Sequence, residues 1–277
     1  MIPFVKGHGL GNDYIVIDAQ DLPAPLTPRQ VQRICDRNWG VGSDGILLLV
    51  PAWTGADFGL RIFNPDGSEA EKSGNGLRIF AKYLHEHGRA SRPAFTVDTK
   101  GGRVGCQCHV AGGRVGEVTV EMGRCTFVAP EIPMTGPARE VVREPLQVGE
   151  RTLSVTVVSV GNPHCVVFAD RLDEAETRRL GPLIENHPAF PRRTHTEFVQ
   201  VVSRGEVVQR TWERGAGETW ACGTGACASV VAAVLNGLAE MDTDVLVHLN
   251  GGDLTIRWPG RDEQVAMTGP AVTVFRG

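Results

Sequence analysis

Two stretches of the chain share one pattern: EKSGNGLRIFAKYLHEHG at residues 71–88 and WACGTGACASVVAAVLNGL at residues 220–238. In both, two glycines separated by one residue are followed by apolar residues spaced i, i+3, i+4 and i+7. That spacing is typical of one buried helix face, so it predicts helices over residues 75–87 and 224–238. Gly88 is a suitable stop for the first helix, because glycine readily adopts the left-handed conformation that ends many helices.

The two helix starts occupy equivalent positions of a weak internal repeat. Ser73 and Cys222 lie 149 residues apart, close to half of the 277-residue chain, and an acidic loop precedes each helix. A duplicated β-rich domain with one main helix in each copy explains this spacing, and a chance likeness of two glycine-rich turns is the alternative. The boundary is expected near Gly123, where strand patterns pause. Because no long linker follows it, the copies are expected to pack directly together.

Most of the remaining chain has the pattern of β-strands. Runs of β-branched residues end at Gly, Pro, Asn or Asp, and pairs such as Gly112-Gly113 and Arg204-Gly205 predict hairpin turns. A helix is expected after Thr27, an N-cap residue followed by proline, and a short one over residues 173–180. The strand runs are VTVEM (118–122), LSVTVVSV (153–160), HCVVF (164–168), EFVQVV (197–202), EVVQRTW (206–212), VLVHL (245–249), LTIRW (254–258) and VTVF (272–275).

Composition excludes several classes of protein. The chain has 28 Lys and Arg against 32 Asp and Glu, a formal net charge of −4, so there is no electrostatic reason to expect nucleic acid or an anionic membrane as partner. No apolar run reaches the roughly 18 residues of a membrane span. The N-terminal sequence lacks the basic region and cleavage pattern of a signal peptide, so a cytoplasmic location is expected.

Seven cysteines are an odd number in a chain of this length, so a disulfide framework is not expected. Cys106-Gln-Cys108-His109 resembles half of a zinc site, but no second pair of matching spacing supplies the other ligands. A strand over residues 102–110 with both cysteines in the core is the simpler interpretation. No metal site is therefore expected.

The helix starts also suggest chemistry. A helix N-terminus presents unpaired N–H groups and a partial positive charge, which bind carboxylates and lower the pKa of a thiol. Cys222, directly before its helix, is expected to be an activated thiolate, whereas Cys227 on the apolar face belongs to the core.

Four dense polar patches are expected in loops, at residues 9–13, 64–67, 161–164 and 213–215. Asparagine and glycine in such patches usually stabilise the turn itself. Arg214 is a better ligand candidate, because a guanidinium group matches a carboxylate with two hydrogen bonds.

Motifs from end to end carry a family resemblance. They are KGHGLGNDYIVID (6–18), GVGSDG (40–45), FNPDGSEAEKSGNGLRIFAKYL (63–84), SVGNPHCVVF (159–168), TEFV (196–199) and ERGAGETWACGTGACAS (213–229). The chain resembles the diaminopimelate epimerase family, cofactor-independent two-base enzymes of lysine and peptidoglycan biosynthesis. The resemblance implies an α+β fold of two pseudo-symmetric halves, each a barrel-like β-sheet around a central helix, with the active site in the cleft between them. The halves would be residues 1–122 with a returning strand at 269–277, and residues 123–268.

The resemblance also implies roles for single residues. Cys222 and Ser73 occupy the two acid/base positions, and His164 and Glu213 would tune their ionisation. The implied partner is a small amino acid, diaminopimelate, with no cofactor, and no pyridoxal motif stands out in the sequence. The family resemblance favours a homodimer. The implied substrate-binding residues are Asn12, Asn64, Gly74, Asn75, Asn162, His195, Glu213, Arg214, Gly223 and Thr224.

Three positions depart from the family pattern. Ser73 stands in place of a second catalytic cysteine, His195 in place of an asparagine that holds the distal end of the substrate, and Gly45 where glutamine is frequent. A serine hydroxyl is a far weaker acid than a thiol, so three functions stay open. They are a diaminopimelate epimerase, a related amino-acid racemase with another side-chain preference, and a ligand-binding or lyase-like protein that retains proton abstraction by Cys222 alone.

Overall fold

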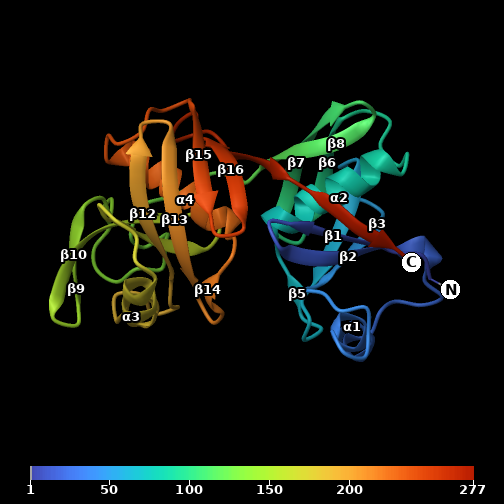
Figure 1. Cartoon of the computed structure of the whole chain (residues 1–277), viewed down its shortest axis with the longest axis horizontal. Coiled ribbons are helices and arrows are strands. Elements are labelled where there is room, and N and C mark those ends of the chain that lie inside the picture. The colour runs from blue at the N-terminus through green and yellow to red at the C-terminus, as the bar shows by residue number, and fades with distance from the viewer. Residues whose placement is uncertain (1) are drawn as a thin grey trace. The chain divides into compact units, whose positions relative to one another are not determined.

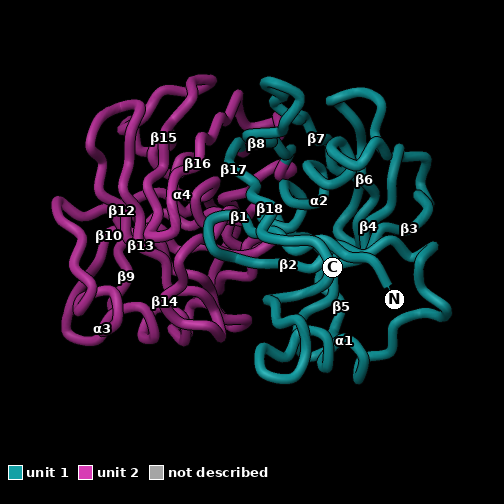
Figure 2. The backbone as a smooth tube through the Cα atoms, turned by 45° about the vertical axis from the view of Figure 1, so that its right-hand side comes forward, with its two compact units in different colours: residues 1–121, 268–277 teal, residues 122–267 magenta. Residues whose placement is uncertain are grey.

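The computed structural model describes residues 2–277, which form two compact units of mixed α and β structure (Figures 1 and 2). Unit 1 ends at Glu121 and regains the chain at Thr268–Gly277, and unit 2 is Met122–Met267. The α+β fold class expected from the sequence is confirmed. Within the described residues, every helix is too short or too polar to cross a membrane.

Unit 1 is built on a sheet whose strands hydrogen-bond in the order β18–β1–β2–β3–β4–β6–β7–β8, with β5 beside β4. The pairs β2–β3 and β4–β6 are parallel, and the others are antiparallel. The elements are β1 (Val5–Gly9), β2 (Asn12–Asp18), the short 3₁₀ helix η1 (Ala19–Asp21), α1 (Pro28–Cys35), β3 (Ile46–Val50), β4 (Phe58–Phe63), β5 (Glu69–Ala70), α2 (Gly74–Glu86), β6 (Ala94–Thr99), β7 (Gly102–Ala111), β8 (Arg114–Glu121) and β18 (Val272–Arg276).

Helix α2 is the central helix of unit 1 and packs against β1, β2, β7 and β8 (Figure 1). Its residues from Asn75 to Ala81 are all buried, so the sheet covers most sides of the first two turns. Gly76 permits this approach, because a Cβ there would lie 2.9 Å from Leu47 Cδ2 on β3. The helix ends one residue before its expected last residue, and Gly88 follows with φ +66° as its stop.

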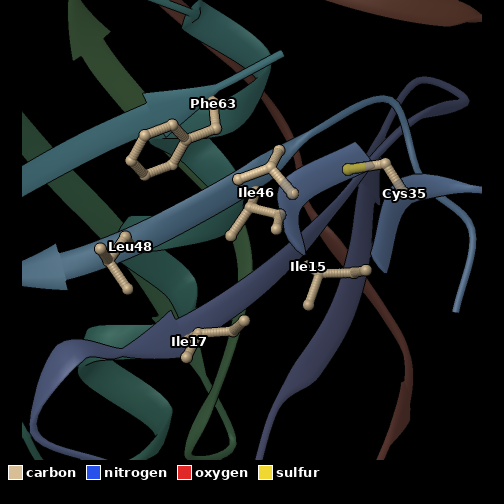
Figure 3. Packing of buried hydrophobic residues seen from close by; sticks show 7 residues of the cluster. Ile15, Ile17, Cys35, Ile46, Leu48 and Phe63 are labelled. Carbon is tan, nitrogen blue, oxygen red and sulfur yellow. The ribbon is translucent and has the colours of Figure 1, made fainter. Parts of the chain in front are cut away.

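The other face of β2 and β3 carries a hydrophobic cluster (Figure 3), to which α1 contributes Val31 and Cys35. Alternate strand residues supply it, while Val16 and Leu47 between them are fully buried on the opposite face. Both faces of this parallel pair are therefore buried, as is usual for parallel strands. The cluster consists of Ile15, Ile17, Val31, Cys35, Ile46, Leu48 and Phe63.

Unit 2 repeats the plan, with strands in the order β9–β10–β11–β12–β13–β15–β16 and β14 beside β13. The pairs β11–β12 and β13–β15 are parallel. The elements are β9 (Glu144–Val148), β10 (Arg151–Ser159), β11 (Pro163–Phe168), α3 (Glu174–Glu185), β12 (His195–Ser203), β13 (Glu206–Glu213), β14 (Gly217–Thr219), α4 (Gly223–Leu235), β15 (Asp244–Leu249), β16 (Gly252–Arg257) and β17 (Ala266–Pro270), which crosses the boundary at residue 268. The eight strand runs quoted from the sequence all fall on strands, except that Met122, Val160 and Trp258 lie one residue beyond the end of their strand.

Helix α4 is the central helix of unit 2 and packs against β10–β13, β15 and β16. It is buried on nearly every side, which suits its almost wholly apolar sequence. The expectation that it reaches residue 238 was wrong. The Asn236 side chain caps it three residues earlier, donating to the Ala232 carbonyl at 2.7 Å, and Gly237 follows with φ +72°.

Helix α3 is longer than the expected 173–180, because Gly181 and Pro182 do not interrupt it. Gly181 lies so close to Trp212 that a Cβ would approach the indole ring to 2.4 Å, and Leu180 and Ile184 are buried on either side. This packing outweighs the one backbone hydrogen bond that proline removes.

The N-terminus of α1 offers a direct test of local sequence signals. The Thr27 backbone N–H donates to Gln30 Oε1 at 2.9 Å, and Gln30 N–H donates to Thr27 Oγ1 at 3.3 Å. Replacing Thr27 by Ala should lower the free energy of unfolding by about 1 kcal/mol, because one helix N–H loses its partner. Urea denaturation of Thr27→Ala, Gln30→Ala and the double variant measures this loss of stability. Since the two bonds are reciprocal, the losses should be less than additive, and strictly additive losses would contradict the capping box.

Candidate active site

In unit 1, the polar groups at the start of α2 come together with one end of β2. Asn12 and Tyr14 are two residues apart on the strand and therefore face the same side. The Tyr14 hydroxyl lies 3.2 Å from Ser73 Oγ, and Asn12 Oδ1 accepts a hydrogen bond from Asn75 Nδ2 at 3.2 Å. Ser73 caps α2, since its Oγ accepts from Gly76 N–H at 3.0 Å. Sequence reasoning missed Tyr14, although it lies in the quoted KGHGLGNDYIVID motif.

Charged side chains hold these amide groups in place. Asn12 Nδ2 donates to Asp44 Oδ2 at 2.9 Å, and Asp44 pairs with Arg37 at 2.7 Å. On the other side, Arg78 donates to Asn75 Oδ1 at 2.9 Å from a fully buried position. Both asparagines therefore have one fixed orientation, in which the Asn75 oxygen and the Asn12 amide nitrogen are already used.

Asn64 is bonded only to its own turn by the hydrogen bonds found among the described residues. Its Nδ2 donates to Ser68 Oγ at 2.9 Å, and its backbone carbonyl accepts from Gly67 N–H at 2.9 Å. The structure joins Asn12 to Asn75 and Ser73 to Tyr14 by hydrogen bonds, and it leaves Asn64 in a turn, as asparagine in this context usually is.

The expectation that all four polar patches lie in loops was wrong for six residues, Gly9, Asn12, Asp13, Pro163, His164 and Glu213. Asn12 begins β2, His164 is the second residue of β11, and Glu213 ends β13. The reason is that the turns are short: two residues, Leu10 and Gly11, connect β1 to β2. The strands therefore extend into the polar segments, which gives these side chains a fixed direction.

In unit 2, Cys222 caps α4 in the way that Ser73 caps α2. Its Sγ accepts from Gly225 N–H at 3.4 Å and lies 3.5 Å from Thr224 Oγ1. Burial raises the pKa of the Cys222 thiol well above its usual range, and negative charge on the nearby carboxyl groups, that of Glu213 first, raises it further. The expectation of an activated thiolate was therefore wrong, because burial and two carboxyl groups outweigh the effect of the helix N-terminus on the thiol pKa.

Asn162, in the turn before β11, connects the groups around Cys222. Its Nδ2 donates to His195 Nε2 at 3.1 Å and to Thr224 Oγ1 at 3.3 Å. Its Oδ1 accepts from His164 Nε2 at 3.1 Å. One amide thus orients two imidazole rings and the hydroxyl group next to the thiol.

This arrangement determines where the proton of His164 lies. Burial lowers the pKa of His164 to about 3, so the ring is neutral at pH 7. Because Nε2 carries the proton donated to Asn162, Nδ1 is an acceptor. It lies 2.9 Å from Glu197 Oε1, and burial raises the pKa of Glu197 to about 8. Glu197 is therefore protonated at neutral pH and donates to His164.

Glu197 was not singled out from the sequence, although the quoted TEFV motif contains it. It is fully buried, and its Oε2 has no hydrogen-bond partner among residues 2–277, which disfavours the charged form further. Gly225 makes room for it, because a Cβ there would lie 2.4 Å from Glu197 Oε1. The sequence carried one signal for this site: a glutamate within an apolar strand pattern, together with a glycine in the quoted CGTG segment that leaves space for a side chain.

His195 lies against His164 in a stacked arrangement, with ring centroids 4.8 Å apart and planes 27° from parallel. Burial lowers its pKa to about 4, and the neighbouring His164 lowers it further. His195 is therefore a neutral ring at pH 7. It presents a buried aromatic surface in addition to its two nitrogen atoms.

Glu213 and Arg214 complete the group at the end of β13. Burial raises the pKa of Glu213, while hydrogen bonds from Thr219 and from the Cys222 thiol lower it in part. Glu213 can therefore accept the proton of Cys222. Arg214 Nη1 donates to the Arg192 carbonyl at 2.8 Å, which leaves further guanidinium N–H groups for a carboxylate.

His164, His195 and Cys222 bring ligand-type atoms within 4.8 Å of one another. Nε2 of each ring, however, is hydrogen-bonded to Asn162, and His164 Nδ1 is bonded to Glu197. The cluster is thus a closed hydrogen-bond network of neutral acids and bases. Its chemistry suits the transfer of protons.

Comparison with solved structures places this architecture in a known fold. A hydroxyproline epimerase from Agrobacterium vitis superposes with a TM-score of 0.70 at 18% identity, covering 100% of this chain and 90% of the other. The Bacillus anthracis phenazine biosynthesis protein of the PhzF family gives 0.71 at 19% identity, covering 100% and 98%. At these identities the likeness defines the fold class: two α+β units, each with a sheet around a central helix.

Sequence comparison is more specific. The diaminopimelate epimerase family profile matches residues 4–128 and 156–274. The diaminopimelate epimerase of Pelotomaculum thermopropionicum is 50% identical over 276 residues, covering 99% of this chain and 97% of the relative. That of Moorella thermoacetica is 48% identical over 276 residues, covering 99% and 98%. The chain belongs to the diaminopimelate epimerase family, which confirms the family resemblance.

The protonation state of Cys222 can be measured by alkylation. Because its pKa is raised, Cys222 should react slowly with iodoacetamide at pH 7, and about tenfold faster for each unit of pH up to 9. Glu213→Gln should speed the reaction, since it removes a negative charge that raises the thiol pKa. Glu218→Gln is the control, because Glu218 pairs with Arg178 and Arg210 instead. Mass spectrometry follows each cysteine separately. If Cys222 reacts faster at pH 7 than a free cysteine, its pKa is not raised and the interpretation as an activated thiolate is correct.

Proposed function

We propose that the chain is a cofactor-independent epimerase that inverts the α-carbon of diaminopimelate, converting the LL to the meso isomer in lysine and peptidoglycan biosynthesis. The observation that carries the proposal is the group of Cys222, Glu213, His164 and Asn162 at the start of α4, with Cys222 and His164 buried, in a chain that belongs to this family. Such a group can remove and return a proton without an external cofactor. Its substrate class is a small amino acid.

On one face of the α-carbon, Cys222 acts as the base. Its thiol proton passes to Glu213, to which it is hydrogen-bonded. The thiolate then takes the α-proton: the C–H bond breaks, an S–H bond forms, and the electron pair stays on the α-carbon and its carboxylate. Because its raised pKa keeps the thiol protonated, the reactive thiolate forms only as Glu213 takes the thiol proton.

The developing negative charge requires stabilisation by fixed dipoles and cations. The N–H groups of Gly223 and Thr224 at the first turn of α4 lie at the positive end of the helix dipole. The corresponding groups in α2 belong to Gly74 and Asn75. We assign Arg214 to substrate binding, because its guanidinium group binds a substrate carboxylate with two hydrogen bonds. The remaining substrate-binding residues carried over from the family are Asn12, Asn64, Asn162, His195 and Glu213.

On the opposite face, Ser73 holds the second acid/base position. The capping geometry of Ser73 on α2 matches that of Cys222 on α4, each accepting from the glycine N–H three residues ahead. Equal local geometry places each reactive atom in the same position relative to its own helix dipole.

A second candidate function is a racemase for an amino acid with a different side chain. His195 is the observation that favours it, because a neutral, stacked imidazole replaces the small amide that the family pattern places there. An imidazole is larger and less polar than an amide, so it suits a less polar distal group. The distal part of the substrate is therefore the point on which the two functions differ.

Exchange of the α-proton in D₂O tests the catalytic assignment. Cys222→Ala and Cys222→Ser should lower α-deuteration of diaminopimelate by about 10²–10⁴-fold or more, since no equivalent base serves that face. The serine variant keeps an oxygen that can cap α4, so a folding defect is separated from the loss of the thiol. Cys227→Ala, in the core of the same helix, should keep the rate within a fewfold. Near-normal exchange in both Cys222 variants, followed by ¹H NMR, would remove the assignment.

Substitution of His195 tests the substrate. His195→Asn should raise kcat/KM for diaminopimelate relative to that for amino acids with short apolar side chains, because the amide restores a polar partner for the distal group. The ratio of the two kcat/KM values is the measurement, and Thr194→Ser, at the neighbouring position, is a conservative control. An unchanged ratio would place His195 away from the substrate. A wild-type preference for the short apolar substrates would favour the racemase.

A further inference from the structure

The hydroxyl group of Ser73 has a defined set of hydrogen-bond partners in unit 1. Its Oγ accepts from Gly76 N–H at 3.0 Å and lies 3.2 Å from the Tyr14 hydroxyl. A serine oxygen has two lone pairs and one proton. If Tyr14 donates to the second lone pair, both acceptor sites are filled and the serine proton is left to point to a substrate. The pair then forms a line from phenol to serine to substrate.

Tyr14 is well suited to supply a proton along this line. A phenol has a reference pKa of about 10, close to the range in which a thiol titrates, whereas a serine hydroxyl is a much weaker acid. Ser73 alone can therefore neither release nor hold a proton readily at neutral pH. A phenol behind it provides the acidity that serine lacks.

The position of Tyr14 is built into the packing of unit 1. The residue is 8% exposed and lies on β2 between β1 and β3. Gly45, just before β3, leaves space for its ring, because a Cβ at Gly45 would lie 2.7 Å from Tyr14 Cε1. Asn12, the same-face neighbour of Tyr14, holds Asn75 at the second residue of α2. The strand and helix are thus aligned at two successive points, which fixes the distance between the two hydroxyl groups.

We propose that Tyr14 is a proton-relay residue for Ser73, so that the two hydroxyl groups together form the second acid/base of the reaction. This inference rests on the proposed function. When the carbanion takes the Ser73 proton, an O–H bond breaks and a C–H bond forms, while the Tyr14 proton moves to Ser73 Oγ. Ser73 ends protonated and Tyr14 ends as the phenolate. Glu213 meanwhile holds the proton that Cys222 gave up, so after the forward reaction solvent takes one proton from Glu213 and returns one to Tyr14. In the reverse direction Ser73 passes its proton to the Tyr14 phenolate as it takes the α-proton, Cys222 gives its proton to the other face of the carbanion, and Glu213 returns a proton to the Cys222 thiolate.

The test combines Tyr14→Phe with Ser73→Cys. In the wild-type background, Tyr14→Phe should lower inversion of diaminopimelate by about 10²-fold or more, the usual contribution of a positioned acid/base group. In the Ser73→Cys background the same change should cost less than about threefold, because a thiol is acidic enough to act without a phenol. Phenylalanine keeps the ring, so the packing around Gly45 is retained.

A second measurement separates the relay from a structural role. Deuteration with retention, by removal and return of a proton at the Cys222 face, should stay within about threefold of wild type in Tyr14→Phe. Tyr83→Phe is the matched control, since the chain has two tyrosines and Tyr83 stacks on His87 at the far end of α2. It should leave both rates unchanged in both backgrounds.

Three outcomes would overturn the relay: equal loss from Tyr14→Phe in both backgrounds, parallel loss of inversion and of retentive exchange, or no loss in the wild-type background. A wild-type protein that exchanges no α-proton of diaminopimelate, or exchanges it without inversion, would refute the proposed function. That result would also remove the proton transfer that the relay serves. Wild-type inversion that survives in Tyr14→Phe would refute the relay alone.

Discussion

The position of the reactive side chain in each unit depends on one hydrogen bond at the start of the central helix, from a glycine N–H to the side chain three residues before it. In α2 the acceptor is Ser73 Oγ, and in α4 it is Cys222 Sγ. The bond fixes the side chain at the positive end of the helix, and the surrounding sheet fixes the helix itself. Glycine is needed at the donor position because Leu47 in unit 1 and Glu197 in unit 2 occupy the space of its Cβ. The reactive atoms are therefore held by backbone geometry and by burial.

Burial also determines the charge state of the group around Cys222. Cys222, His164, His195 and Glu197 are all driven to their neutral forms, and the pKa of Glu213 is raised as well. Isolated charges are costly in such a place, so the group stores protons and passes them along hydrogen bonds. A substrate that brings its own charges changes this balance when it enters.

The sequence predicted the fold well because its strongest signals are local. Apolar spacing located the two central helices, glycine pairs located the hairpins, and Thr27 with Pro28 located α1. The predicted helix ends were less accurate. The end of α4 depends on a hydrogen bond from the Asn236 side chain to Thr156 on β10, and the continuation of α3 depends on the packing of Gly181 against Trp212. The pKa of Cys222 and the contact of Tyr14 with Ser73 could not be predicted, because both arise from residues distant in sequence.

The pairing of β18 with β1 has a consequence for the order of synthesis. Residues 268–277 belong to unit 1, and β18 hydrogen-bonds to β1, but they leave the ribosome only after all of unit 2. Phe4 and Gly277 exchange backbone hydrogen bonds at 2.9 and 3.1 Å, so β1 gains its edge partner from residues that are translated after unit 2. Unit 2 is continuous in sequence and can complete its sheet during translation. Unit 1 must keep one edge of β1 unpaired until β18 has been made, so the sheet that is begun first is completed after the other.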